Sequence, residues 1–225
     1  MGLDRIILDL QDKVLKLSDE VEALQREVAE LKNGKPVPVS TAAKPGKNIN
    51  SKIRGSISKN ELVGAVRRNL ADKIPAEDIL KGSRKEGSGI VITNGAGKLK
   101  ISLRGSGFYG KDDVSSRMMY TGFSTISKKT IYDDNGQFAY DFFVFAVNHS
   151  DDAEQPDIDF FVFDQDEFKH LLDAKSPSGK NEMYYFYFGK TVDGHYIDDR
   201  ERNQEIILDV DHDAWDKVVV AYDKL

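Results

Sequence analysis

Apolar residues recur at alternating spacings of four and three over the first 31 residues of the chain. The repeat consists of Leu3, Ile7, Leu10, Val14, Leu17, Val21, Leu24, Val28 and Leu31. A sustained period of 3.5 residues is that of a left-handed coiled coil, whereas a helix folded onto its own domain has a broader apolar stripe. We therefore predict that residues 1–32 form a coiled coil that joins separate chains.

The residue types at the two core positions indicate how many chains associate. With Ile7 at position a, every a residue is β-branched and every d residue is leucine, a distribution that favours a parallel dimer. No asparagine at position a fixes the number of strands, and Glu27 with Lys32 is the one complementary g–e pair. We expect a homodimer, and a trimer or tetramer stays open.

Residues 33–51 separate this helix from the rest of the chain. The segment, NGKPVPVSTAAKPGKNINS, contains three prolines and two glycines and few bulky apolar side chains. Such a composition predicts a flexible, partly extended linker. Residues 52–225 are then the globular domain.

Charge is distributed unevenly along the chain, although the net charge is only −6. Residues 41–111 hold fifteen basic and five acidic residues, whereas residues 112–225 hold eleven basic and 25 acidic residues. This segregation indicates either a face that binds polyanions or two halves that pack together and neutralise each other. The chain has no cysteine, which excludes disulfides and thiolate zinc sites.

Nothing in the chain indicates a membrane. No apolar run approaches the roughly 20 residues that a spanning helix needs, and the first residues, MGLDRIILDL, lack the basic stretch and apolar block of a secretory signal. We expect a cytoplasmic protein without a membrane partner.

Helix and strand signals are mixed through the globular domain. Ser58 and Glu61 form a capping box before a helix over 59–73, and the Asn94-Gly95 turn joins strands at 90–92 and 98–104. Further strands are predicted at 122–132 and 138–147, with DDNGQ as the turn between them, and at 157–163, 183–188 and 205–210. Helices are predicted over 164–172, capped by Asp164 with Glu167, and over 212–222. The fold class is therefore α+β, or mixed α/β.

Basic residues alternate along the strand at 98–104. If Leu99, Ile101 and Leu103 face the core, then Lys98, Lys100 and Arg104 share the other face as a cationic row. The alternative is an edge strand whose lysines block unwanted strand pairing.

Two glycine-rich basic segments, GSRKEGSG at 82–89 and RGSGFYG at 104–110, are typical of loops that contact phosphates. Neither has the spacing of a Walker or Rossmann phosphate loop. We therefore expect no bound nucleotide, and these segments add to the predicted polyanion-binding face.

Metal-ligand patterns are weak. The histidines at 149, 170, 195 and 212 show no ligand spacing and are predicted to be surface or structural residues. Asp209, Asp211 and Asp213 form a D-x-D-x-D, but a calcium loop needs Gly and Glu where this chain has Ala214 and Val220. We expect no metal site and no cofactor, and we expect Asp211 or Asp213 to cap the last helix.

The order of elements over about residues 56–175 resembles that of the restriction-endonuclease-like, or PD-(D/E)XK, superfamily. The resemblance is carried by four stretches, namely SKNELVGAVRRNL, GIVITNGAGKLKISL, GFSTISKKTIYDDNGQFAYDFFVFAV and DIDFFVFDQDEFKHLL. The third stretch is similar to the strand pair that follows the catalytic hairpin. The resemblance implies a restriction-endonuclease-like central sheet flanked by helices.

The active-site pattern of this superfamily is incomplete in the chain. Its members need an acid near the first hairpin strand and an acid-x-Lys on the second, because carboxylates hold the Mg²⁺ that activates water. Lys100 matches the family lysine, but Lys98 stands where the acid is expected, and SGIVITN at 88–94 has none. Glu61 matches a helix acid that some members use. The resemblance thus implies the fold and argues against hydrolysis.

These observations lead to three hypotheses. The first is a homodimeric DNA- or RNA-binding protein with a catalytically silent nuclease-like domain, in a restriction or defence setting that the resemblance alone implies. Its phosphate contacts would be Arg67, Arg68, Arg84, Lys85, Lys98, Lys100 and Arg104. The second is an active Mg²⁺-dependent nuclease that uses non-standard residues from the set Glu61, Glu86, Lys100, Asp141 and Asp159. The third is a protein-interaction or structural module.

Overall fold

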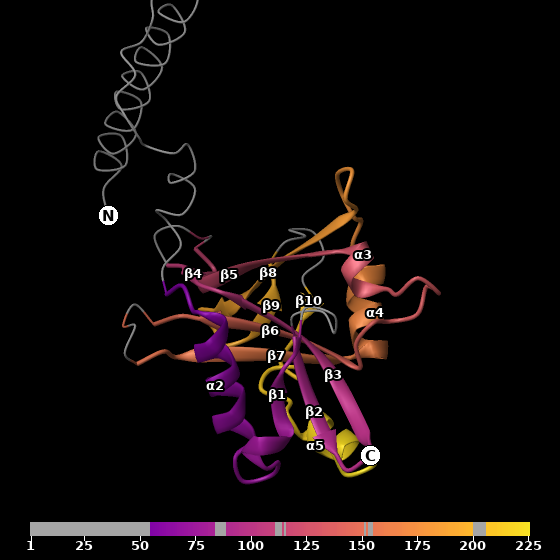
Figure 1. Cartoon of the computed structure of the whole chain (residues 1–225). Coiled ribbons are helices and arrows are strands. Elements are labelled where there is room, and N and C mark those ends of the chain that lie inside the picture. Colours follow the sequence, from indigo (N-terminus) through magenta and orange to yellow (C-terminus); the bar gives the residue numbers. More distant parts are fainter. Residues whose placement is uncertain are drawn as a thin grey trace, which may run out of the picture. The chain divides into compact units, whose positions relative to one another are not determined.

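The computed structural model describes residues 55–83, 89–110, 114, 116–150, 152, 155–199 and 206–225. The predicted coiled coil and linker lie outside these residues, as do Arg84, Lys85 and Glu86. The described part of the chain has an α+β fold with two five-stranded sheets (Figure 1), in agreement with the predicted class.

The first sheet has the strand order β1-β2-β3-β6-β7. Its strands are β1 (Ile79–Lys81), β2 (Ile90–Asn94), β3 (Gly97–Ser106), β6 (Phe142–Asn148) and β7 (Ile158–Asp164). Strands β3 and β6 run parallel, and the other neighbours are antiparallel. Every residue of β6 is buried, because both faces of this inner strand are covered.

The second sheet was not expected from the sequence. It is antiparallel throughout and has the order β10-β9-β8-β5-β4. Its strands are β4 (Phe108–Tyr109), β5 (Met118–Ser127), β8 (Met183–Thr191), β9 (Tyr196–Asp198) and β10 (Ile206–Ile207). Its buried face packs on the first sheet through aromatic rings, such as Phe186 and Phe188 against Phe145.

Helices complete the layers on both sides of the first sheet. One face contacts α2 (Lys59–Leu70) and α5 (Asp216–Tyr222), whose apolar residues share a core with Ile101 and Val144. The other face contacts α3 (Lys128–Ile131), α4 (Gln165–Asp173) and the second sheet. A helical layer therefore covers one face of the first sheet, and a mixed layer covers the other (Figure 1).

Several local predictions are confirmed. Ser58 and Glu61 form the predicted reciprocal capping box of α2, and Asp164 and Glu167 form that of α4. Strands β2 and β3 pair as a hairpin, and Gly95 adopts the positive φ of 57° that favours glycine in a tight turn. These features depend on neighbouring residues, which explains why the sequence alone predicts them.

The predicted strand pair at 122–132 and 138–147 is wrong. Residues 128–131 form helix α3, and β5 and β6 belong to different sheets. Around the DDNGQ turn, only an isolated bridge between Tyr132 and Phe138 remains of the expected pairing. β6 is apolar except for Asn148 at its end and lies between β3 and β7, whereas the more alternating β5 pairs with β4 and β8.

Other corrections concern element ends. Segment 104–110 forms the end of β3 and all of β4 rather than a loop. Residues 76–81, for which the sequence predicted no helix or strand, contain a 3₁₀ turn (Ala76–Asp78) and β1. Helix α2 ends at Leu70, and β10 has two residues.

The last helix begins at Asp216, after Trp215, with no side-chain cap. The prediction that Asp211 or Asp213 caps this helix is therefore wrong. Asp211 instead binds the Lys217 ammonium at 2.9 Å, and Asp213 accepts the Phe160 N–H at 3.3 Å. The Asp213 carboxylate thus ties the C-terminal segment to β7, whereas the Asp211–Lys217 pair lies within this segment.

Candidate functional site

The cationic row on β3 has the predicted alternation. Leu99, Ile101 and Leu103 are buried in the core that includes α2, and Lys98, Lys100 and Arg104 alternate with them. Because Arg104 is in register with Phe145, which packs on the second sheet, the row occupies the face opposite α2. The edge-strand alternative is wrong, since β3 lies between β2 and β6.

Arg104 also lines a cavity of about 590 Å³ between the two sheets and α3. Two further cations, Lys129 and Lys180, line this cavity. Its other polar lining residues are Thr125, Ser127, Thr130, Asn181 and Glu182. Glu182 binds the Lys128 ammonium at 2.7 Å, so this carboxylate already has a cationic partner.

The guanidinium of Arg104 is partly buried beside Tyr140. Burial lowers the pKa of Arg104, and the Tyr140 phenol opposes this shift. Arginine stays charged in proteins even after such a shift. The cavity therefore has a fixed positive charge with hydroxyl and amide groups around it, an arrangement that suits an anion.

Lys59 is the centre of a further group of positive charges, to which Lys81 and Arg104 contribute. Burial lowers the pKa of Lys59, and repulsion from Lys81 and Arg104 lowers it further. Lys81 donates to Asn60 Oδ1 at 2.8 Å, next to Lys59 in α2. No local spacing connects residues 59, 81 and 104, so only the fold shows this concentration of positive charge. We call Lys98, Lys100, Arg104, Lys129 and Lys180 the cationic surface.

The other predicted phosphate contacts are not part of this surface. Arg67 and Arg68 lie in the last turn of α2, on the helix that covers the opposite face of the first sheet. Arg67 donates to Ile79 O from Nε at 3.1 Å and from Nη2 at 2.6 Å. Its guanidinium therefore attaches α2 to β1.

The structure does not bring the proposed catalytic acids together. Glu61 is held in the capping box of α2, and Asp141 accepts the Lys100 N–H at 2.7 Å at the start of β6. Asp159 is in register with Val147, near the other end of β6. These three acids consequently have separate surroundings.

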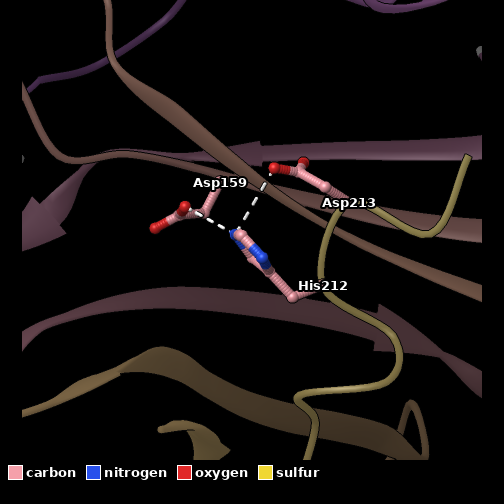
Figure 2. Close-up of side chains that lie close together, drawn as sticks. All are labelled: Asp159, His212 and Asp213. Atoms are coloured by element: carbon pink, nitrogen blue, oxygen red, sulfur yellow. Dashed lines mark hydrogen bonds and ion pairs between the residues drawn. The ribbon is translucent and has the colours of Figure 1, made fainter. Parts of the chain in front are cut away.

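Asp159 belongs to a group of histidine and aspartate side chains at the start of β7. Its Oδ1 lies 2.7 Å from His212 Nε2, and Asp213 Oδ2 lies 3.5 Å from the same nitrogen. Figure 2 shows both carboxylates facing this ring nitrogen. The loop before α5 is held in place by a backbone bridge between His212 and Phe161 in β7.

A second histidine approaches Asp159 from the end of β6. His149 Nε2 lies 3.5 Å from Asp159 Oδ2 and 3.5 Å from Asp157 Oδ1. We call Asp157, Asp159, Asp213, His149 and His212 the Asp159 cluster.

Two tyrosines of the second sheet hold this cluster. The Tyr120 hydroxyl donates to Asp159 Oδ2, and the Tyr196 hydroxyl donates to Oδ1 at 3.4 Å. The Tyr120 ring stacks on His149 with centroids 4.5 Å apart, and Tyr196 stacks on His212 at 3.6 Å. Both imidazole rings are thus fixed in orientation.

Burial and charge affect the protonation of the cluster. Burial lowers the pKa of His149, with Asp157 opposing the shift and Lys190 and His212 adding to it. Burial also raises the pKa of Asp213, against the effect of His212. A neutral imidazole has a free lone pair, so the group presents nitrogen and oxygen atoms of the kind that bind metals or accept protons.

The sequence does not reveal this group, although Asp159 is among the candidate catalytic residues. His170 and His195 are exposed, and His195 pairs with Asp209 at 2.8 Å. His149 and His212 instead converge on one carboxylate. They are 63 positions apart, which hides them from any search for local ligand spacing.

Comparisons of the chain with protein-family models, with curated proteins and with solved structures find no match. None of the helices in the described part of the chain is long and apolar enough to cross a membrane. The fold class of the described part of the chain is α+β, and its two candidate sites are the cationic surface and the Asp159 cluster.

Proposed function

We propose that this chain is a homodimeric nucleic-acid-binding protein that contacts phosphates through the cationic surface. The single observation that carries the proposal is the row of Lys98, Lys100 and Arg104 on one face of an inner strand, with Arg104 continuing into a cavity that Lys129 and Lys180 also line. A row of cations with a polar cavity at one end suits a polyanion better than a single small ion.

The chemistry of the surface fits phosphate oxygens. Arginine offers a planar fork of N–H donors that can bind two phosphate oxygens at once, and the lysines add point charges along the row. Backbone contacts of this kind fix the position of a nucleic acid without reading its sequence. The proposal therefore covers DNA and RNA, and it assigns no base preference.

Two further parts of the proposal come from the sequence. The nuclease-like interpretation is supported by helix α2 followed by the β2–β3 hairpin with Lys100, and Lys98 at the acid position argues for a catalytically silent domain. The heptads of residues 1–32 support a dimer, which would raise the apparent affinity by presenting two cationic surfaces to one nucleic acid.

The test is a titration of labelled DNA and RNA at two or more salt concentrations, with and without Mg²⁺ or Mn²⁺, monitored for binding and for cleavage. We expect the full chain to bind, with affinity that falls by about one logarithmic unit per logarithmic unit of salt for each phosphate contact. Replacing Lys98 and Lys100 with Glu should weaken binding and reduce the salt slope by about two.

The matched control is Arg68→Glu with Lys73→Glu. Arg68 lies in the last turn of α2 and Lys73 lies three residues after its end, and both are exposed. The pair changes the net charge by the same amount, and α2 covers the other side of the first sheet. We expect the control to keep the salt slope of the unmodified chain. Equal losses in both double variants would show a general charge effect and overturn the assigned surface.

The remaining hypotheses give different results in the same assay. A full chain that binds neither DNA nor RNA at physiological salt would overturn the proposal and favour a protein-interaction or structural module. Mg²⁺-dependent cleavage that is lost in Glu61→Gln would instead establish an active nuclease.

A further inference from the structure

Side chains of metal-ligand type converge on Asp159, where the start of β7 meets the second sheet. One ligand atom each from Asp159, His212 and Asp213 lies within 4.8 Å of the others (Figure 2). His149 approaches the second oxygen of Asp159 from the opposite side. We propose that this cluster binds a divalent transition-metal ion, with Asp159, His212 and Asp213 as ligands.

The separations of the ligand atoms are close to those of a tetrahedral site. Bonds of about 2.0–2.2 Å from a metal to nitrogen or oxygen place neighbouring ligand atoms about 3.3–3.6 Å apart. The observed separation is 3.5 Å from His212 Nε2 to Asp213 Oδ2. The hydrogen bond between His212 and Asp159, at 2.7 Å, must break when the ion binds. A small rotation of the Asp159 carboxylate is enough to separate the two atoms.

The donor set selects a class of ion. Imidazole nitrogen suits Zn²⁺, Fe²⁺, Ni²⁺ and Cu²⁺, while Mg²⁺ and Ca²⁺ prefer sites made of oxygen alone. An imidazole with two carboxylates therefore favours a borderline transition metal over an alkaline-earth ion.

The surroundings hold the ligands in advance. The Tyr120 and Tyr196 hydroxyls each bond to one oxygen of Asp159, and the two tyrosine rings stack on the two imidazoles. Partners of this kind, which orient metal ligands, are typical of metal sites in proteins.

Access and charge also support a cation. The Asp159 side chain is 10% exposed, but that of Asp213 is 45% exposed, so an ion can enter from the side of Asp213. Asp157 brings a third carboxylate within 3.5 Å of His149. Three carboxylates that gather around two imidazoles repel one another, and a divalent cation would relieve this repulsion.

The inference is independent of the proposed nucleic-acid binding. Tyr120 lies near the start of β5, whereas Thr125 and Ser127, which line the Arg104 cavity, lie at its end. Either site can therefore fail its test without deciding the other.

The test is calorimetric titration of the metal-stripped full chain with Zn²⁺, Mn²⁺ and Co²⁺, and with Mg²⁺ for comparison. We expect one transition-metal ion per chain at micromolar or tighter affinity, much weaker Mg²⁺ binding, and a visible Co²⁺ spectrum that reports nitrogen and oxygen ligands. A transition-metal affinity no tighter than millimolar would overturn the proposal.

Two variants locate the ion. Asp213→Asn keeps the Oδ1 acceptor for the Phe160 N–H, and Asn tolerates the φ of 49° at this position, so the fold should be retained. It removes a charged ligand, and we expect the affinity to fall at least about tenfold. His212→Gln removes an imidazole ligand and should weaken binding at least as much.

The matched control is His195→Gln, which removes an exposed histidine that pairs with Asp209 at 2.8 Å. This variant should bind the metal like the unmodified chain. Unchanged affinity in both Asp213→Asn and His212→Gln would show that the ion binds elsewhere, and would overturn the assigned ligands. Unfolding curves of each variant confirm that it is folded before its affinity is compared.

Discussion

Lys175 and Asp198 form an ion pair inside the domain, outside both candidate sites. Their side chains are 2% and 0% exposed, and Nζ lies 2.7 Å from Oδ2. Lys175 Nζ makes no hydrogen bond within the described residues and lies 5.1 Å from the centre of the Phe186 ring. Because both groups have lost their water, the Lys175 charge depends on Asp198 for compensation.

We therefore expect Asp198→Asn to destabilise the fold by about 3–5 kcal/mol, since the buried ammonium loses its counter-charge. Replacing both partners, with Lys175→Met and Asp198→Asn, should recover much of this loss because no buried charge remains. Urea unfolding measures both changes. A loss below about 1 kcal/mol in Asp198→Asn would mean that water reaches the pair.

Single residues also show which parts of the sites a sequence can predict. The alternation on β3 was predicted because strand side chains point to opposite faces at a period of two. The pairing of His149 and His212 with Asp159 was not, since three separate segments supply these residues. Alternation is a local property, whereas convergence depends on how distant segments pack.

At the scale of elements, one glycine determines how closely the two sheets approach. A Cβ on Gly122 of β5 would lie 2.5 Å from Val147 Cγ2 and 2.7 Å from Val147 Cγ1 in β6. Contacts this short cannot be accommodated without displacement of one strand. The absence of a side chain at Gly122 thus allows β5 to pack directly on β6.

We expect Gly122→Ala to destabilise the domain by about 1–3 kcal/mol, because the added methyl group forces the strands apart. Gly64→Ala provides the comparison, since a Cβ on this residue of α2 would meet only Arg68 Nη1, at 3.6 Å. Removing a glycine from a helix should stabilise the fold by about 0.5–1 kcal/mol. Thermal unfolding of both variants tests the packing, and equal effects would contradict it.

Elements differed in how well they could be predicted. Capping boxes at Ser58 and Asp164 marked helix starts, because the bonds that define them join residues three apart. The partner of β5 could not be predicted, since it pairs with β8 more than 50 residues later. Strand pairing depends on which distant surface covers the strand, and the local pattern does not record this.

At the scale of the whole molecule, the heptads of residues 1–32 predict that two chains associate. Replacing Leu17 and Leu24 with Lys places charges at two core positions of the seam, so we expect sedimentation to show a shift from two chains to one. The control replaces Asp12 and Asp19 with Lys, at positions that point away from the seam, and should stay dimeric.

The mass of the unmodified chain in solution tests the predicted coiled coil directly. A mass of a single chain at micromolar concentration would contradict the predicted coiled coil. If the dimer is confirmed, the Leu17→Lys and Leu24→Lys variant should also bind nucleic acid more weakly than the control, because only one cationic surface is then available per molecule. Equal binding would show that dimerisation does not contribute.

Features that depend on near neighbours could be predicted from the order of residues alone. These are the capping boxes, the β2–β3 hairpin, the alternation of β3 and the α+β class. Three features follow from the packing of distant segments. The strands divide into two sheets, Arg104 lines a cavity with Lys129 and Lys180, and Asp159 lies beside two histidines. The physical reason is that periodicity and caps act over a few residues, whereas sheet pairing and core packing select among distant segments that all have suitable patterns.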